Sequence, residues 1–193
     1  LDDKVLAVAE RGHTAEQVTN AVNLLKKYGF KVGLQLMVGM PEQDFASVKD
    51  TVEKVLTLKP DIARIYPLLV IKGSPLAKIY EAGEFEPLSL EEAVEQAAYM
   101  YKKLSEAGIK IIRVGLQPDD ELCAEGNILA GPFHPSMGEL VQSYILREKL
   151  TPQILETAKQ NGEAILILCP RRLESKLRGI RNSNIHYWSL LIS

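Results

Sequence analysis

The sequence is poor in the residues that build metal centres and disulfide frameworks. Its 193 residues include two cysteines, Cys123 and Cys169, and three histidines, His13, His134 and His186. The cysteines lie far apart and form no CxxC pair, which argues against a disulfide scaffold or a zinc ribbon and fits a reducing cytoplasm. The histidines share no metal-ligand spacing. We therefore expect a cytoplasmic protein without a metal site of its own.

Long apolar runs and local catalytic motifs are also missing. No stretch approaches the roughly 18 apolar residues that a membrane span needs, and there is no signal-peptide pattern. The sequence has no GxGxxG, no Walker loop, no HExxH and no GxSxG. No complete active site is therefore encoded by a local motif.

The charged residues are unevenly distributed. Residues 151–193 hold six basic and three acidic side chains, a net charge of +3, although the whole chain has a formal net charge of −2. The two parts of the chain are therefore expected to face different partners.

Three stretches have the spacing of an amphipathic helix, with apolar residues at i, i+3, i+4 and i+7. Two of them begin with a capping box, formed by Thr14 with Gln17 and by Ser89 with Glu92. The predicted helices cover residues 14–28, 42–58 and 89–104.

Apolar runs that alternate with these helices predict buried strands, at residues 31–38, 62–71 and 109–116. Such alternation indicates a parallel sheet covered by helices, and therefore an α/β fold. Because side chains alternate along a strand, Gln35 and Met37 are expected on the same face of the sheet.

The strand predicted at residues 31–38 stops abruptly at Gly39 and Pro41. In parallel sheets, ligands collect at this end of the strands, and a glycine lets the backbone approach them closely. The alternative is an ordinary turn, in which Glu42 and Asp44 complement the dipole of the next helix. The residues alone leave both interpretations open.

Arg11 stands in the stretch RGHT, just before the helix predicted from residue 14. Its planar fork is suited to gripping a carboxylate or a phosphate. The alternative is a surface ion pair with a neighbouring carboxylate.

The C-terminal part is predicted to begin with a loop at residues 118–135. Helices at 136–149 and from 151, a strand at 164–169, a basic helix and an edge strand at 185–191 follow. The basic residues Arg171, Arg172, Lys176, Arg178 and Arg181 could contact RNA phosphates, or could form a solvated helix face.

Four motifs together resemble a known family. In order, RGHT, YGFKVGLQLMVGMP, RIYPLLVIKGSPL and YEAGEFEPLS are similar to the second half of a radical S-adenosylmethionine (SAM) domain. The resemblance is closest to the elongator-catalytic-subunit type, with a more distant likeness to oxygen-independent coproporphyrinogen dehydrogenase. It covers residues 1–90, and residues 109–145 resemble the tail of bacterial proteins of this group.

The resemblance implies a fold and a division of the chain. The expected fold is part of a (β/α) radical-SAM-type barrel with mostly parallel strands and a C-terminal α/β extension. Residues 1–118 would be the second half of the barrel, residues 119–150 a family-specific extension, and residues 151–193 a basic α/β appendage.

It also implies cofactor-binding residues. Arg11 stands where the family grips the SAM carboxylate, and Gln35 where it contacts the ribose. Met37 and Pro67 are expected against the adenine, and Gly39 lets the backbone close on the nucleoside.

The chain departs from the family in one respect. Three cysteines that would ligate a [4Fe–4S] cluster are absent, and Cys123 and Cys169 cannot replace them. SAM and the cluster are therefore expected in an intact protein, whereas this chain alone should hold neither and be inactive. Because the sequence opens with Leu1 directly in helical pattern, we expect a fragment.

The intact enzyme would cleave SAM reductively and modify a substrate, with tRNA as the expected partner. The alternative is a non-catalytic α/β module that binds RNA or protein. The strand at 31–38 would leave an exposed apolar edge, which we expect to be covered by homodimerisation or by the strand at 164–169 or 185–191.

Overall fold

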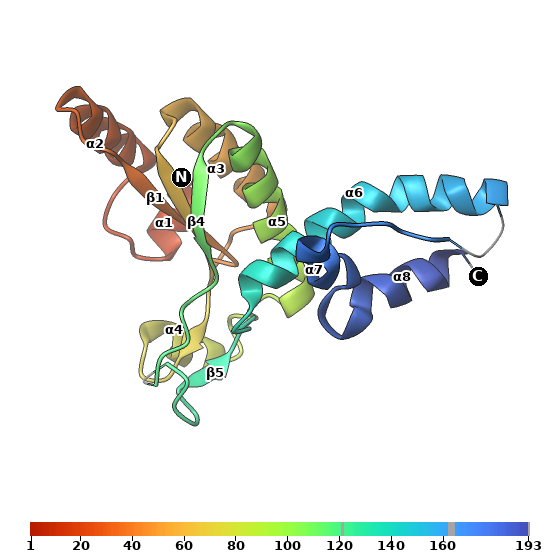
Figure 1. Ribbon diagram of the computed structural model, residues 1–193. Coiled ribbons are helices and arrows are strands. Elements are labelled where there is room, and N and C mark those ends of the chain that lie inside the picture. Colours follow the sequence, from red (N-terminus) through yellow and green to blue (C-terminus); the bar gives the residue numbers. More distant parts are fainter. Residues whose placement is uncertain (121, 162–164, 193) are drawn as a thin grey trace. The chain divides into compact units, whose positions relative to one another are not determined.

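The computed structural model describes residues 1–120, 122–161 and 165–192 (Figure 1). The chain forms two compact units, Leu1–Met137 and Gly138–Ser193. The predicted division after residues 118 and 150 stays a prediction. Among the described residues, no helix combines the length and apolar character needed to cross a membrane.

The first unit alternates helices with short strands. Its elements are α1 (Asp3–Val8), α2 (Ala15–Lys27), β1 (Gly33–Val38), α3 (Phe45–Leu58), β2 (Ile62–Pro67), β3 (Val70–Ile71), α4 (Pro75–Glu81), α5 (Leu90–Glu106), β4 (Lys110–Val114) and β5 (Ile128–Ala130).

The three predicted strands form one parallel sheet in the order β1-β2-β4. Gln35 of β1 lies opposite Arg64 of β2, and Met37 lies opposite Tyr66. The predicted α/β fold with mostly parallel strands is therefore confirmed, as is the shared face of Gln35 and Met37.

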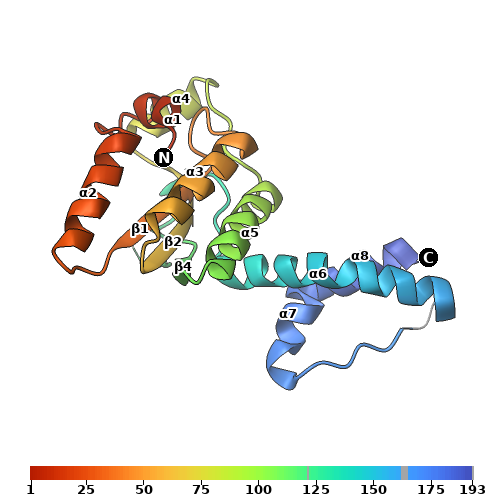
Figure 2. The same cartoon turned by 90° about the horizontal axis from the view of Figure 1, so that it is seen from above.

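Helices α3 and α5 lie side by side (Figure 2). Val48, Val52 and Val55 of α3 are fully buried, as are Ala63 and Ile65 of β2. The 3.6-residue spacing of α3 and the two-residue spacing of β2 bring these apolar side chains together. The opposite face of the sheet is less buried and carries Gln35, Met37, Arg64 and Tyr66.

The predicted capping boxes are both present. Thr14 and Gln17 begin α2, and Ser89 and Glu92 begin α5. Helix α3 begins at Phe45 rather than near Glu42, because the Asp44 side chain accepts a hydrogen bond from the Ser47 N–H at 2.7 Å.

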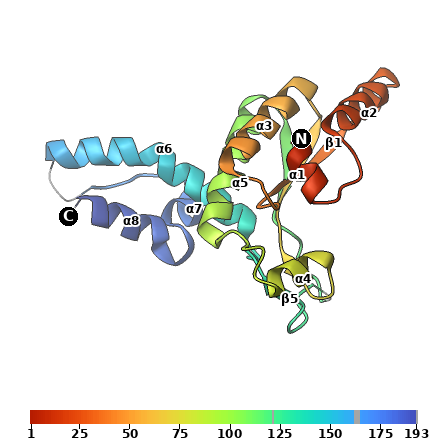
Figure 3. The same ribbon diagram turned by 180° about the vertical axis from the view of Figure 1, so that it is seen from behind.

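Two expectations for unit 1 are corrected. The run at 62–71 is not one strand, because β2 ends at Pro67 and the chain resumes as β3. The stretch at 118–135 is not only loop, since β5 pairs antiparallel with β3. Figure 3 shows this small sheet beside α4.

The second unit continues α6 (Met137–Asn161) and adds η1 (Arg171–Leu173), α7 (Glu174–Arg178), η2 (Ile180–Asn182) and α8 (Ser183–Ile192). The predicted helices at 136–149 and from 151 are one helix that passes through Pro152. The predicted basic helix is broken at Gly179 and Arg181, which have positive φ of 72° and 53°.

The predicted strand at 185–191 is wrong, because these residues lie in α8. Helical spacing brings Ile185, Trp188 and Ile192 into a core with Ile154 and Leu177. Residues 165–169 of the other predicted strand belong to no sheet, and its first residue, 164, lies outside the described residues.

Candidate functional site

A cavity of about 230 Å³ lies along β1 in unit 1. Three of the five residues expected to bind a cofactor line it: Arg11, Gln35 and Met37. The other lining residues come from the N-terminal segment, α1, the α1–α2 loop, α2, β1, the β1–α3 turn and α3: Leu1, Asp2, Val5, Leu6, His13, Val18, Leu34, Leu36, Met40, Gln43 and Thr51.

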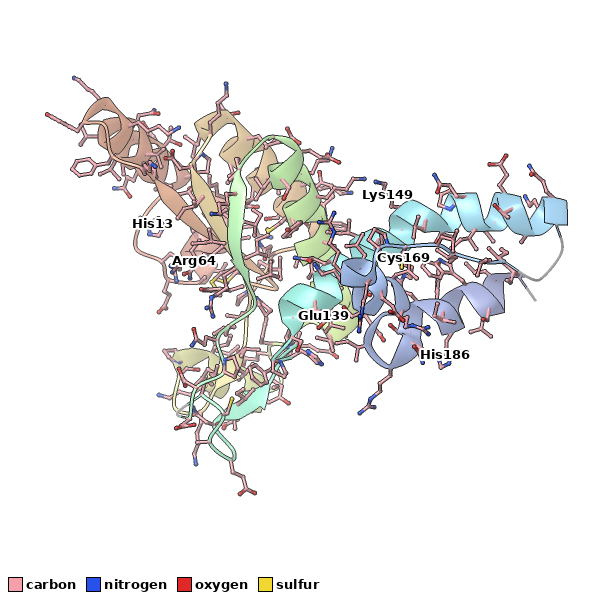
Figure 4. The ribbon with its side chains drawn as sticks, in the orientation of Figure 1. His13, Arg64, Glu139, Lys149, Cys169 and His186 are labelled. Atoms are coloured by element: carbon pink, nitrogen blue, oxygen red, sulfur yellow. The ribbon has the colours of Figure 1, made fainter. Side chains whose placement is uncertain are left out.

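Arg11 reaches this cavity from a tight loop between α1 and α2. The Arg11 N–H donates to the Leu6 carbonyl at 3.0 Å, and positive φ at Glu10 and Gly12 reverses the chain. The carbonyl of Arg11 lies 2.8 Å from Nδ1 of His13, whose position on unit 1 is labelled in Figure 4. The Arg11 side chain is exposed and makes no ion pair with any described residue.

The β1–α3 turn is held by Gln43, a residue that the sequence interpretation missed. Its Nε2 donates to the Met37 carbonyl at 3.2 Å, and its Oε1 accepts from the Met40 N–H at 3.1 Å. The sequence offered one signal for this role, an amide side chain that closely follows the predicted strand end. Such an amide can donate to a backbone carbonyl and accept from a backbone N–H.

Gly39 and Pro67 lie at the strand ends but do not line the cavity. Gly39 has a φ of +81°, and a Cβ at this position would lie 3.0 Å from Cδ1 of Leu88. Pro67 is buried and is the Cα partner of Val38, the last residue of β1. The absence of a side chain at Gly39 therefore leaves room for the Leu88 side chain.

An ion pair links α1 to the same turn. The Lys4 Nζ lies 2.9 Å from Glu42 Oε2. The hydrogen bond and charge of Glu42 raise the pKa of Lys4 above its ordinary value. Because both groups are exposed, this pair orients the turn more than it stabilises the fold.

The residues present fit one expected cofactor and not the other. A guanidinium, an amide and a thioether suit the carboxylate, the ribose and the adenine of SAM. A [4Fe–4S] cluster does not fit this chain, which has two free cysteines, Cys123 and Cys169, one in each unit. Within the described ranges, no three His, Cys, Asp or Glu residues group as metal ligands.

The basic residues expected to meet RNA lie on η1, α7 and η2 of unit 2. Arg171, Arg172 and Arg181 are exposed, and Lys176 is half-buried. Arg178 is also exposed but forms a salt bridge with Glu174 at 3.0 Å.

Comparison with known proteins identifies relatives of the chain. Residues 60–147 match the Radical_SAM C-terminal domain. The tRNA uridine(34) acetyltransferase of Methanocaldococcus jannaschii is 34% identical over 146 residues, which make up 74% of this chain and 26% of that protein. Protein YhcC of Escherichia coli K12 is 33% identical over 100 residues, 52% of this chain and 32% of that protein.

A solved structure is also similar. The archaeal Methanocaldococcus infernus Elp3 with an N-terminal deletion has a TM-score of 0.68 and 32% sequence identity, over 77% of this chain and 34% of that chain. This chain therefore spans about a quarter to a third of the length of these proteins. The chain is related to the elongator-like radical-SAM proteins and carries their C-terminal domain.

Proposed function

We propose that this chain is the C-terminal half of the catalytic domain of a cytoplasmic radical-SAM enzyme that modifies tRNA. The observation that carries the proposal is the gathering of Arg11, Gln35 and Met37 around one cavity. Relatives named for tRNA uridine(34) acetylation support the choice of substrate.

In this proposal the chain binds and orients SAM. The Arg11 fork holds the methionyl carboxylate, and the Gln35 amide hydrogen-bonds the ribose hydroxyls. Met37 packs against the adenine, with Pro67 and Gly39 closing the strand ends beside it. SAM and a [4Fe–4S] cluster would supply reductive cleavage in the intact enzyme, but this chain lacks the thiolates to hold the cluster and is assigned no step through it.

The test is SAM binding by the full-length protein that contains this chain. Arg11→Ala is expected to weaken SAM binding by about 1.5–3 kcal/mol, the range for a hydrogen bond to a charged group. Lys31→Ala is the matched control, because Lys31 is exposed and does not line the cavity. If calorimetric titration shows that both variants bind SAM with equal affinity, Arg11 does not contribute to SAM binding.

The basic residues of unit 2 are proposed to contact tRNA. Arg171, Arg172, Lys176, Arg178 and Arg181 would neutralise phosphates, so their replacement with Gln should weaken tRNA binding and flatten its salt dependence. Lys159→Gln on α6 is the control, since this exposed lysine lies outside the group. An unchanged salt dependence would exclude these residues from the interface.

The alternative function is a non-catalytic module that binds RNA or protein. It is favoured by the exposed Leu166 and Leu168 in unit 2, whose side chains are 85% and 87% exposed beside the basic residues in sequence. A measurement of SAM binding distinguishes the two functions. If the full-length protein binds tRNA but not SAM, the non-catalytic module is favoured.

A further inference from the structure

Two arginines lie opposite each other on the exposed face of the sheet. Arg64 of β2 is the Cα partner of Arg113 of β4. Both side chains are exposed, whereas Ala63 and Ile65 on the other face of β2 are fully buried. Figure 4 labels Arg64 on this sheet.

An irregularity in the strand pairing creates this arrangement. Ala63 pairs with Ile111, but the next residue, Arg64, pairs with Arg113, so that Ile112 is left without a partner. In an unbroken ladder Ile112 would face Arg64. Such bulges re-aim side chains and recur beside functional sites. Here the bulge brings two positive charges together.

Arg64 and Arg113 also line one hollow of about 440 Å³, together with Tyr66, Leu116, Gln117, Asp119 and Leu122. Neither arginine has an ion pair with a described residue. Among the described lining residues, Asp119 is the one carboxylate, and it accepts the Leu122 N–H at 2.7 Å. Like charges opposite each other on neighbouring strands are unfavourable, and a bound anion would offset that cost.

The register of the sheet places the two arginines in the same row as Gln35 of the candidate SAM site. Gln35, Arg64 and Arg113 form one row across β1, β2 and β4, and Met37 with Tyr66 begins the next row. Neighbouring strands are about 4.8 Å apart, so the backbones of Gln35 and Arg113 at the two ends of this row are about 10 Å apart. That spacing allows a second substrate to meet SAM on the same face.

We propose that Arg64 and Arg113 bind a phosphate group of the second substrate, with Tyr66 available to stack on its base. Two guanidinium forks provide planar pairs of donors that match phosphate oxygens, and an aromatic ring in the same hollow suits a nucleobase. The phosphate could come from an RNA backbone or from a mononucleotide. The choice of RNA rests on the proposed function, whereas the phosphate site does not.

The test uses the full-length protein with two probes, a labelled single-stranded RNA and uridine monophosphate. Arg64→Gln and Arg113→Gln are each expected to weaken RNA binding about tenfold, as for the loss of a charge-assisted hydrogen bond. The double variant should reduce the magnitude of the slope of log K against log[salt] by about 0.7, the value for one lost phosphate contact on a single strand. Arg64→Lys should keep the slope but lose part of the affinity, because a lysine keeps the charge without the fork.

Lys102→Gln on α5 is the control for net charge, because Lys102 is exposed and belongs to the helix that packs on β2 and β4. If it weakens RNA binding as much as the arginine variants do, or if those variants bind both probes normally while retaining native circular dichroism, the proposal is overturned. Loss of RNA binding alone identifies an RNA phosphate, and loss of both probes identifies a site for either source.

Calorimetric titration of the unsubstituted protein with SAM separates the two proposals. Protein that binds no SAM yet loses phosphate binding in the arginine variants would contradict the proposed function and support the phosphate site.

Discussion

The side-chain amide of Gln43 donates to the carbonyl of Met37 at 3.2 Å, which ties the β1–α3 turn to the last residues of β1. The same side chain accepts the Met40 N–H at 3.1 Å. Gln43 therefore shapes one wall of the cavity without being a residue that family resemblance would select.

Gln43→Ala should destabilise unit 1 by about 1–2 kcal/mol, because two backbone groups in a half-buried turn lose their partner. It should also weaken SAM binding, since Met37 and Met40 would no longer be held. The measurements are urea unfolding followed by circular dichroism and calorimetric titration. Glu42→Ala is the control and should cost less than Gln43→Ala, because it removes an exposed ion pair. Equal losses for both variants would contradict a special role for Gln43.

We expect a glycine to be required at position 39 for two reasons: its positive φ and the nearby Leu88 side chain. Gly39→Ala and Gly73→Ala both place a side chain at positive φ, which costs about 1–3 kcal/mol. Only at Gly39 would the new Cβ lie 3.0 Å from Leu88, whereas Gly73 has nothing within 4 Å. Gly39→Ala should therefore be the more destabilising change, and Leu88→Ala should relieve part of it in a double-mutant cycle. Additive effects would show that Leu88 does not crowd this glycine.

Because of the capping box of α5, the free energy of unfolding of unit 1 should depend on pH in the acidic range. The Ser89 hydroxyl and the Ser89 N–H donate to Glu92 at 2.7 and 2.8 Å, and the hydroxyl above all lowers the pKa of Glu92 from its ordinary value of 4.5. Because the pKa is lower in the folded state, this stabilisation is fully present above pH 4.5 and is lost as the pH falls through the lowered pKa.

Glu92→Gln supplies the comparison, because glutamine keeps the cap but does not titrate. The difference in free energy of unfolding between the two proteins should shrink from about pH 7 to about pH 3, as measured by urea unfolding. A difference that is independent of pH would mean that Glu92 is not stabilised by the cap.

Asn184 should be essential to the packing of unit 2. This side chain is 2% exposed, and its Nδ2 donates to the carbonyls of Ser143, Lys176 and Leu177 at 3.1 to 3.2 Å. Asn184→Ala leaves buried acceptors unpaired and should cost about 3 kcal/mol. Trp188 is the sole tryptophan and is 3% exposed in this unit, so its fluorescence reports the unfolding of unit 2.

Ser189→Ala on the same helix is the control for Asn184, since Ser189 is exposed and should change stability by less than about 0.5 kcal/mol. If Asn184→Ala and Ser189→Ala unfold at the same urea concentration, the buried amide network is not what holds α6, α7 and α8 together.

The free edge of β1 should promote association. Among the described residues β1 pairs with β2 alone, and the segments expected to cover its other edge form helix α8 or join no sheet. Internal covering by a strand at 185–191 is therefore wrong, and homodimerisation stays a prediction. Sedimentation of this chain should show a dimer whose share rises with concentration. A monomer at every concentration would contradict it.

The sequence by itself determined the local elements and their order. Capping boxes at Thr14 and Ser89 specify helix starts through bonds three residues apart, and alternation of apolar residues specifies which faces of β1 and β2 are buried. Because these signals act over a few residues, the parallel α/β fold and the shared face of Gln35 and Met37 could be predicted.

Only the tertiary structure decided which distant residues meet. The residues at 185–191 have strand-like composition but form α8, since burying Trp188 against Ile154 and Leu177 outweighs local propensity. The space that Gly39 leaves for the Leu88 side chain and the pairing of Arg64 with Arg113 likewise depend on segments far apart in sequence. A bulge of one residue decides the arginine pair, and register between strands is a property of the assembled sheet.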